Sequence, residues 1–355
     1  MEVNIVTDEL KNIINKITYK GIADSQKSLL IETCKDNVEC FVCNPVYAIE
    51  LKMTIPADII EEGRTLIPNS LFKVIQAINA DVITITDNGI EYGENTIKYV
   101  PIDTREFIKV DKDKRKNLLF SIPEKELYGL IKSTFYAVAI DKTRPILTGL
   151  NFNKNNVAAL DGYRLAVSES KEFNIDGSIT LSCQTIKALL KILDKKSDGI
   201  VNFYITQNQD FIIIEINNIT VTAHLLDGNY IKYDSIIPED HDYEIEIDVK
   251  ELLKKLKFMF ELKKSVPEIV RLTIDHTQLY IENNNSSADI KDSIGINVIE
   301  HGYLPFSIAF NPLYLRDALK KYNALAIMQF STGVSPALIK ANNNLDLVLP
   351  IRFKE

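Results

Sequence analysis

The sequence contains no tryptophan, and only 4 of its 355 residues are cysteine, 13 glycine and 12 proline. So little glycine and proline excludes collagen-like and low-complexity chains, and so few cysteines exclude a disulfide scaffold. No run approaches the roughly 18 consecutive apolar residues of a membrane-spanning helix, and the N-terminal stretch does not have the pattern of a signal peptide. We therefore expect a cytoplasmic globular protein, whose length predicts two or three domains.

Three of the cysteines, Cys34, Cys40 and Cys43, lie close together. A Cys-x2-Cys pair is half of a zinc site, but no pair of histidines stands at ligand spacing to complete it. The surrounding segment also reads as a strand. We interpret these residues as buried or half-buried structural thiols, because free cysteine is among the most buried residue types. We expect no metal and no cofactor.

Motifs for catalysis are also missing. The sequence has no Walker loop, no G-x-G-x-x-G after a strand, no H-E-x-x-H and no G-x-S-x-G. Asp161 and His224 could be combined with a serine, but a chain of this length offers such triples anywhere. The sequence therefore predicts a protein that is not an enzyme, with no catalytic residues.

One pattern occurs three times: an amphipathic helix, alternating strands, a second amphipathic helix and more strands. The first helices are predicted to begin near residues 7–10, 124–127 and 248–252. In the second helices an apolar stripe recurs at helical spacing, and its members are Leu71, Val74, Ile75 and Ile78, then Ile186, Leu189, Leu190 and Leu193, then Leu315, Ala318, Leu319 and Tyr322. Chance explains a single match more easily than three matches in the same order. We predict an α+β protein of three repeated domains, at 1–118, 119–243 and 244–355.

The distribution of charge is more informative than its total. With 41 Lys+Arg against 49 Asp+Glu, the net charge of -8 argues against a nucleic-acid ligand. Six predicted helical segments nevertheless carry 20 basic and 9 acidic residues, and these segments are 8–20, 69–79, 123–142, 182–196, 249–264 and 311–321. Helix propensity and the helix dipole explain about half of this excess. Repeated basic helix faces favour contact with phosphates without base reading.

Four segments of the chain carry a family resemblance. Residues 145–152, PILTGLNF, are followed by 158–167, AALDGYRLAV, and further on come 228–238, GNYIKYDSIIP, and 347–353, LVLPIRF. In this order and spacing they resemble the bacterial sliding clamp, the DNA polymerase III β subunit. With the three repeats, the resemblance covers the whole chain.

The resemblance implies a head-to-tail homodimer that forms a ring of six clamp-fold domains, in each of which two helices pack on antiparallel sheets. The helices would line a hole around double-stranded DNA, which is bound without sequence specificity. The expected function is that of a processivity factor that slides on DNA and tethers the DNA polymerase III catalytic subunit, the clamp loader and other proteins that carry a clamp-binding motif. The basic residues expected to face the DNA are Lys11, Lys73, Lys132, Lys187, Lys191, Lys195, Lys250, Lys254, Lys257, Arg316 and Lys320.

The resemblance also implies two protein interfaces. Ile97 and Tyr99 would meet the region of Phe260 and Leu262 across the dimer. A pocket for linear peptide motifs would form between the middle and C-terminal domains, lined by Leu147, Leu160, Gly162, Tyr163, Arg164, Leu165, Ile231, Ser235, Ile236, Val334, Pro336, Leu347, Leu349, Pro350 and Arg352. Without the resemblance, the alternating Leu347 and Leu349 would read as core.

The chain departs from the family pattern at Leu160, where threonine is usual, and at Ile231, where proline is usual. Both changes keep or add apolar surface, so they bear on motif preference more than on the existence of the pocket. An alternative function remains open, that of a clamp-fold adaptor that binds peptides and is not loaded on DNA. The basic helices favour the clamp, because such an adaptor has no need for them.

Overall fold

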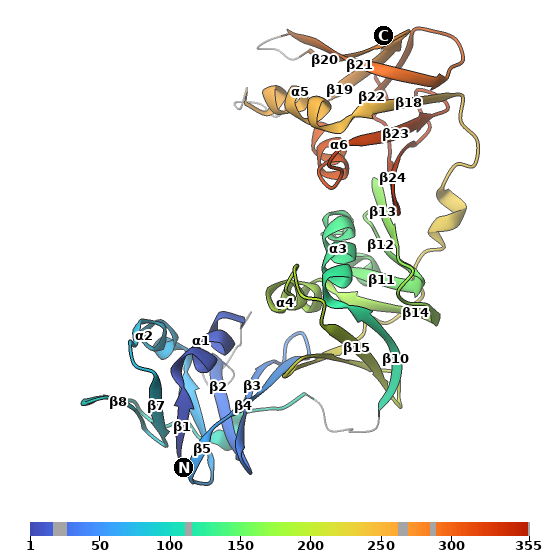
Figure 1. Ribbon diagram of the computed structural model, residues 1–355. Coiled ribbons are helices and arrows are strands. Elements are labelled where there is room, and N and C mark those ends of the chain that lie inside the picture. Colours follow the sequence, from blue (N-terminus) through green and yellow to red (C-terminus); the bar gives the residue numbers. More distant parts are fainter. Residues whose placement is uncertain (17–26, 111–115, 262–268, 285–288, 354–355) are drawn as a thin grey trace. The chain divides into compact units, whose positions relative to one another are not determined.

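The computed structural model describes residues 1–16, 27–110, 116–261, 269–284 and 289–353 (Figure 1). Its strands form sheets of five, eight and twelve members, and the strand pairs within them run antiparallel. Helices and antiparallel sheets occur in alternation along the chain. The predicted α+β class is therefore confirmed.

One order of elements occurs three times, with one additional strand in the first repeat, which confirms the predicted repeat. The first repeat consists of β1 (Glu2–Val6), α1 (Thr7–Lys16), β2 (Ser28–Cys34), β3 (Asn37–Asn44), β4 (Ile49–Pro56), β5 (Asp58–Glu61), β6 (Arg64–Pro68), α2 (Phe72–Ala77), β7 (Val82–Thr86), β8 (Gly89–Tyr92) and β9 (Asn95–Lys98). The second consists of β10 (Lys116–Pro123), α3 (Glu124–Thr134), β11 (Gly149–Lys154), β12 (Asn156–Leu160), β13 (Arg164–Glu169), β14 (Ile175–Ser182), α4 (Cys183–Ile192), β15 (Ile200–Thr206), β16 (Phe211–Ile216) and β17 (Ile219–His224). The third consists of β18 (Tyr243–Asp248), α5 (Val249–Glu261), β19 (Val270–Asp275), β20 (Gln278–Asn284), β21 (Asp289–Glu300), β22 (Phe306–Phe310), α6 (Pro312–Leu319), β23 (Leu325–Phe330), β24 (Ala337–Ala341) and β25 (Asn344–Val348).

Three of the helices begin at side chains that satisfy their first backbone N–H groups. Asp248 Oδ1 accepts hydrogen bonds from the N–H of Lys250 and of Glu251, at 2.8 and 3.1 Å. Ser182 Oγ caps α4, and Asn311 Oδ1 caps α6 in the same way. Such caps typically stabilise a helix by about 1 kcal/mol. The three predicted starts of the first helices are confirmed, since α1, α3 and α5 begin within those segments.

The apolar stripes of the second helices face the core, with one exception. In α6 the stripe from Leu315 to Leu319 is fully buried, and Tyr322 just beyond the helix is nearly so. In α2, however, Val74 is 43% exposed, because this helix spans only residues 72–77 and buries little besides Ile75. A fully buried leucine or isoleucine stabilises the fold by about 1.5–3 kcal/mol.

The chain divides into two compact units. The first comprises 1–128, 172–175 and 181–226, and the second comprises 129–171, 176–180 and 227–355. The middle repeat is thus shared between them, with α3 crossing from one to the other. The predicted boundaries near residues 118 and 243 stay a prediction, although β18 begins at Tyr243.

Sheets run on from one repeat into the next. In the first unit β17, the last strand of the second repeat, pairs with β4, with Val221 opposite Leu51. In the second unit β25, the last strand of the third repeat, pairs with β13, with Leu347 opposite Leu165. At both joints, therefore, the last strand of one repeat pairs with the fourth strand of the repeat before it.

The cysteines have the predicted structural character in part. Cys40 and Cys43 on β3 are buried, and burial raises the pKa of both thiols, to about 12 at Cys43. Cys34 at the end of β2 is exposed, so the prediction that it is buried or half-buried is wrong. Within the described ranges no histidine, cysteine and carboxylate side chains gather into a metal-ligating group. None of the helices described there has the length and apolarity needed to cross a membrane.

Candidate functional site

An apolar cluster in the second unit joins segments that lie far apart in the sequence. Its buried members are Leu147, Ala158, Leu160, Leu165, Val167, Tyr233, Leu338 and Leu347, and Ile231 and Leu349 are among the half-buried residues packed against it. The pairing of β13 with β25 brings these segments together, because it sets Leu165 opposite Leu347. Six of the predicted pocket residues therefore share one cluster, which we call the apolar cluster.

A tight turn at the edge of the cluster connects β12 to β13. Asp161 Oδ1 accepts hydrogen bonds from the backbone N–H of Tyr163 and of Arg164, at 3.0 and 3.1 Å. Gly162 has a φ of +90°, a conformation in which a side chain would be strained. The motif Asp-Gly-Tyr-Arg thus encodes a turn whose first residue holds the backbone of the third and fourth.

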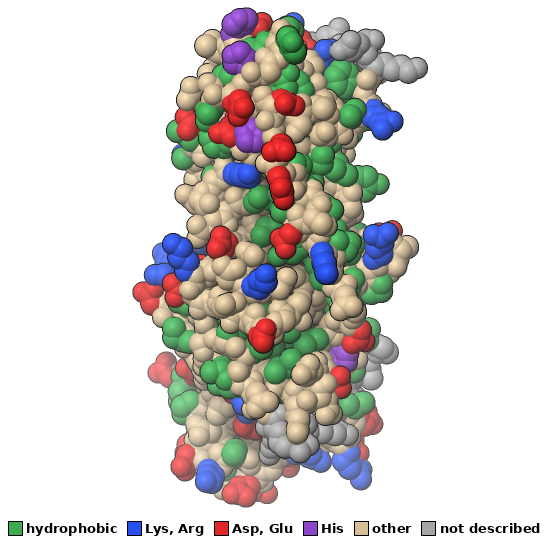
Figure 2. All heavy atoms as spheres, turned by 90° about the vertical axis from the view of Figure 1, so that its right-hand side faces the viewer, with side chains coloured by type: hydrophobic (Ala, Val, Ile, Leu, Met, Phe, Trp, Pro, Cys, Tyr) green, Lys and Arg blue, Asp and Glu red, His purple; other side chains and the backbone are tan. Residues whose placement is uncertain are grey.

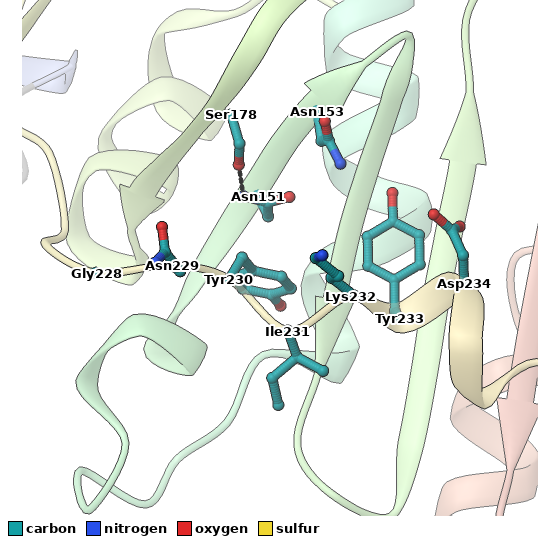
Figure 3. A pocket seen from close by; sticks show the side chains of 10 residues that line it. All are labelled: Asn151, Asn153, Ser178, Gly228, Asn229, Tyr230, Ile231, Lys232, Tyr233 and Asp234. Carbon is teal, nitrogen blue, oxygen red and sulfur yellow. Dashed lines mark hydrogen bonds between the residues drawn. The ribbon is translucent and has the colours of Figure 1, made fainter.

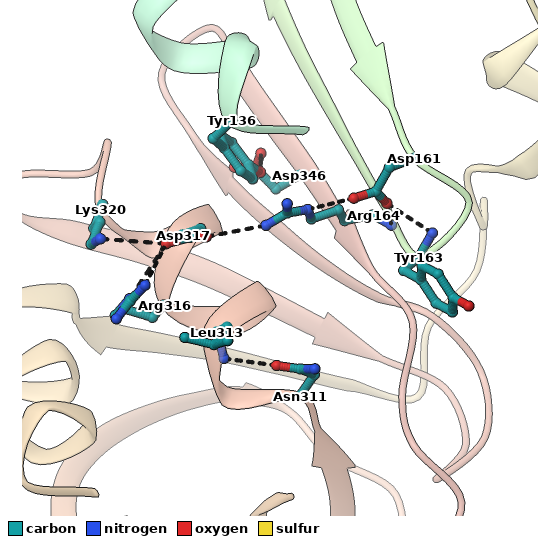
Figure 4. A network of polar contacts seen from close by, with 10 residues as sticks. All are labelled: Tyr136, Asp161, Tyr163, Arg164, Asn311, Leu313, Arg316, Asp317, Lys320 and Asp346. Carbon is teal, nitrogen blue, oxygen red and sulfur yellow. Dashed lines mark hydrogen bonds and ion pairs between the residues drawn. The ribbon is translucent and has the colours of Figure 1, made fainter. Parts of the chain in front are cut away.

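The Arg164 side chain is anchored on several sides, as Figure 4 shows. Its Nε lies 2.9 Å from Asp161 Oδ2, and its Nη1 lies 3.3 Å from Asp317 Oδ2 on α6. The guanidinium also packs over the ring of Tyr314, 4.6 Å from its centroid. Only 9% of the side chain is exposed. Arg164 therefore fastens the turn to α6 and presents little of its charge to a ligand.

Large apolar side chains remain exposed around the cluster. Tyr163 is 59% exposed, and its ring stacks on Tyr314 at a centroid distance of 5.7 Å. Its carbonyl oxygen accepts a hydrogen bond from Leu349 N–H at 2.9 Å. Ile236 and Val334 are also exposed. Isolated exposed apolar residues are common. These three, however, adjoin a cluster whose members come from segments far apart in the sequence.

The other predicted pocket residues lie near the cluster in sequence but do not belong to it. Ser235 and Ile236 form one short helical turn with Tyr233. Val334 and Pro336 lie in the loop before β24, whose Leu338 is a member of the apolar cluster. Pro350 is half-buried after β25, whereas Arg352 is exposed beside Ile351, whose N–H donates to Ala309 O.

Comparison with known proteins places this geometry in a family. Residues 121–232 match the DNA polymerase III beta subunit, central domain, and residues 234–352 match its C-terminal domain. The chain belongs to the bacterial sliding clamp family, the β subunits of DNA polymerase III. The beta sliding clamp of Bacillus subtilis is 31% identical over 245 residues, which are 65% of this chain and 64% of that protein.

Two further comparisons extend over nearly the whole chain. The beta sliding clamp of Staphylococcus epidermidis is 24% identical in an alignment that covers 99% of this chain and 97% of that protein. The crystal structure of the DNA polymerase sliding clamp from Bacillus subtilis covers all of both chains with a TM-score of 0.90 at 22% identity. The clamp fold of this chain is therefore confirmed across all three repeats.

The structure separates the basic residues of this clamp into two groups. Those with exposed side chains on or just after a helix are Lys73, Lys132, Lys187, Lys191, Lys195, Lys250, Lys254, Lys257 and Lys320. Lys195 lies beyond the end of α4. Lys11 and Arg316 are only half-exposed. The Lys11 ammonium donates to Ile78 O at 2.7 Å, and Arg316 pairs with Asp317 at 3.1 Å. Both side chains are thus engaged within the protein.

One further lysine lies inside the protein. The Lys321 side chain is 8% exposed, and its ammonium pairs with Asp346 at 2.9 Å. The chain leaves α6 after Leu319, and Lys321 turns inward. On the face drawn in Figure 2 acidic and basic side chains are interspersed, without a large region of one sign.

The residues predicted at the dimer interface are described in part. Ile97 lies on β9, opposite Ile90 of β8, and is half-buried. The Tyr99 hydroxyl donates to Thr86 O at 3.3 Å, and burial raises its pKa. Phe260 lies on α5, whereas Leu262 falls outside the described residues.

Sequence reasoning missed the partners of Arg164. Tyr314 and Asp317 lie on α6, 150 positions and more from the turn that they contact. No local pattern indicates such a contact. The available signal was the arginine itself within an apolar run, since a charge placed there needs a counter-charge.

Proposed function

We propose that this chain is a DNA polymerase processivity factor, a ring-shaped clamp that encircles duplex DNA, slides on it and tethers other proteins. Its membership of the β subunit family is the observation that carries this proposal. We propose no catalytic role for it, and we place its work in the cytoplasm, beside the replicating DNA.

Exposed basic side chains on the helices support the contact with DNA. Lysine is a flexible point charge, so it can pass from one phosphate to the next without reading bases. A closed ring holds DNA by topology, so each phosphate contact can be weak enough to allow sliding. The basic residues of α4 and α5, such as Lys187 and Lys254, suit this role because they are exposed.

The repeated joint supports a head-to-tail homodimer. The last strand of a repeat pairs with the fourth strand of another, as β17 does with β4 and β25 with β13. Within the described residues, one last strand and one fourth strand have a free edge that lacks a partner of this kind. β9 pairs with β8 alone, and the 289–295 part of β21 pairs with β20 alone.

A third joint of this kind is satisfied by two copies of the chain. β9 of one subunit would pair with β21 of the other, and the dimer would contain this contact twice, which closes the ring. Unpaired strand edges are templates for further pairing, so this closure also protects both edges.

The apolar cluster and the exposed apolar side chains around it support the tethering role. We propose that Tyr163, Ile236, Val334 and Leu349 border a groove for short peptides with apolar anchors, such as those of the polymerase catalytic subunit and the clamp loader. Apolar anchors seated in an apolar site with few polar groups are typical of such recognition. Arg164 acts as a positioning residue that holds the Tyr163 turn against α6.

A peptide titration tests this role directly. A synthetic clamp-binding peptide with leucine and phenylalanine anchors should bind the native chain saturably, and Leu349→Lys should weaken that binding by tenfold or more, about 1.4 kcal/mol. Ile299→Lys is the control for a lysine at another apolar position of the same unit, because Ile299 is 52% exposed and lies on β21. Equal binding by Leu349→Lys would refute the assignment of the groove.

A further inference from the structure

Within the described part of the chain, one carboxylate, that of Asp317 on α6, contacts three cationic side chains. Its Oδ1 lies 3.1 Å from Arg316 Nη2 and 3.3 Å from Lys320 Nζ, and its Oδ2 lies 3.3 Å from Arg164 Nη1. A charge-assisted N–H···O contact at full strength measures about 2.7–2.9 Å. All three contacts are longer than that, so the charge of the carboxylate is divided among the three cations.

The three cations belong to two different surfaces. In Figure 4 Arg164 reaches Asp317 from one side, whereas Arg316 and Lys320 reach it from the other. Arg164 is nearly buried and belongs to the turn that presents Tyr163 to the proposed peptide groove. The Lys320 side chain is 56% exposed, and both it and Arg316 are among the residues predicted to face DNA. Asp317 therefore lies between the two proposed binding surfaces.

Of the two carboxylates that pair with Arg164 in the described ranges, Asp317 is the one that ties the turn to α6. Asp161 stands three residues before Arg164 in the turn itself, so their contact at 2.9 Å holds the turn together internally. The Tyr314 ring on α6 also contacts the guanidinium, but it carries no charge that a phosphate could compete for. The strength with which α6 holds the turn therefore depends on how much of Asp317 is left to Arg164.

Bound DNA changes that share. Phosphate oxygens accept from lysine and arginine as a carboxylate does, so they compete with Asp317 for Lys320 and Arg316. When these two cations turn to phosphates, more of the carboxylate is available to Arg164, and the contact between Arg164 and Asp317 shortens. Water and salt screen this contact less than an exposed ion pair, because the Arg164 side chain is nearly buried.

We propose that Asp317 couples the two surfaces, so that the clamp binds its peptide partners more tightly when duplex DNA occupies the basic helix faces. The shortened contact holds the Tyr163 turn against α6 in advance, so less ordering is left for the peptide to bring about. The coupling is reciprocal, and a bound peptide tightens DNA binding by the same factor. This inference rests on the proposed function, because it needs both the peptide groove and the DNA-facing helices.

The coupling directs partners to clamps that are already on DNA. Free clamps carry the same groove and compete for the same peptide motifs. A groove that binds more weakly in the absence of DNA leaves more of the polymerase and of the other partners for the clamps that encircle DNA.

Calorimetric titration of the native full chain measures the coupling. A clamp-binding peptide of zero net charge is titrated with and without a saturating short linear duplex at low salt, so that direct attraction between peptide and DNA is small. We expect the peptide to bind about fivefold more tightly with DNA, and the duplex to bind more tightly by the same factor with saturating peptide. Equal peptide affinity with and without DNA would overturn the coupling.

Two variants test whether Asp317 carries the effect. Asp317→Asn keeps the shape of the side chain but removes its charge, so the ratio of the two peptide affinities should fall to about one. Lys320→Gln removes one of the competing cations and should lower the ratio, because less of the carboxylate is freed when DNA binds. If both variants keep the native ratio, the coupling does not pass through Asp317 and the proposal is wrong.

Lys232→Gln is the matched control. Lys232 is an exposed lysine of the same unit, and it lies in the segment 228–234, which lines a separate polar pocket (Figure 3). Its neighbour Ile231 packs against the apolar cluster. This variant removes one positive charge close to the groove and should keep the native ratio. If it lowers the ratio as much as Lys320→Gln does, the effect follows net charge and the proposal is wrong.

The same titrations separate a failure of the coupling from a failure of the proposed function. If the peptide does not bind the native chain without DNA, the groove is refuted and the coupling with it. If the duplex does not bind, the DNA-facing helices are refuted and the coupling again falls with them. If both ligands bind and neither changes the affinity of the other, the coupling alone is refuted.

Discussion

Lys321 Nζ lies 2.9 Å from Asp346 Oδ1, in an ion pair whose two side chains are 8% and 0% exposed. Tyr136 and Tyr322 donate their hydroxyl protons to the same carboxylate, and Lys321 also donates to Ser133 O at 3.1 Å. Burial lowers the pKa of Lys321 and raises the pKa of Asp346. The pair therefore fastens the end of α3, the end of α6 and β25 within the second unit.

Asp346→Asn should destabilise the protein by about 3–5 kcal/mol at pH 7, because the buried Lys321 ammonium loses its counter-charge. Burial holds the folded-state pKa of Lys321 below its unfolded value of 10.5, so the unfolded chain binds the extra proton. The stability of the variant should therefore rise with pH from that lowered pKa toward 10.5, more steeply than that of the native chain. Chemical denaturation followed by tyrosine ellipticity at pH 7 and 9.5 measures this.

Asp346→Asn combined with Lys321→Met is the control for that prediction. The double variant removes both charges, so it should recover much of the lost stability and should not show the added pH dependence. If Asp346→Asn alone is as stable as the native chain at both pH values, the Lys321–Asp346 ion pair does not hold these elements together.

Lys254→Gln should weaken binding to short duplex DNA at low salt, because Lys254 is exposed on α5. The slope of log affinity against log salt concentration should become shallower by about 0.9 for the lost phosphate contact. Lys11→Gln is the matched control, because the Lys11 ammonium donates to Ile78 O. Fluorescence anisotropy over a salt series measures both slopes, and equal slopes for the two variants would contradict the placement of the DNA contacts.

Thr96→Pro should weaken the proposed dimer by about tenfold or more, because it removes an N–H from the free edge of β9. The turn at Gly93 and Glu94 makes Tyr92 and Asn95 a hydrogen-bonded pair, so Thr96 turns its N–H away from β8. Sedimentation equilibrium measures the dissociation constant.

Val100→Pro is the control for introducing a proline close to the free edge of β9. Val100 lies beyond β9, and it precedes Pro101, so its backbone already favours the extended region that proline adopts. This variant should dimerise like the native chain. If Thr96→Pro dimerises equally well, β9 is not part of the interface.

Local pattern predicted most of the fold. The apolar stripes located the second helices, and acidic or hydroxyl residues such as Asp248 marked helix starts, because both signals act within a few residues. Alternation also predicted that strands stand between the two helices of each repeat and after the second one.

Contacts at long range could not be predicted in this way. In the sequence, Lys11 and Lys321 cannot be told from exposed helix lysines. In the structure the Lys11 ammonium donates to Ile78 O, and the Lys321 ammonium pairs with Asp346. The role of Arg164 depends on Asp317, 153 positions away.

Retention on circular DNA tests the central claim most directly. The clamp is loaded onto a nicked circle by a clamp loader, and the fraction that stays bound in high salt is measured before and after one restriction enzyme linearises the DNA. An encircling clamp should stay on the circle and leave the linear DNA, because topology and not phosphate contact retains it. If the retained fraction is the same on circular and linear DNA, the protein does not encircle DNA.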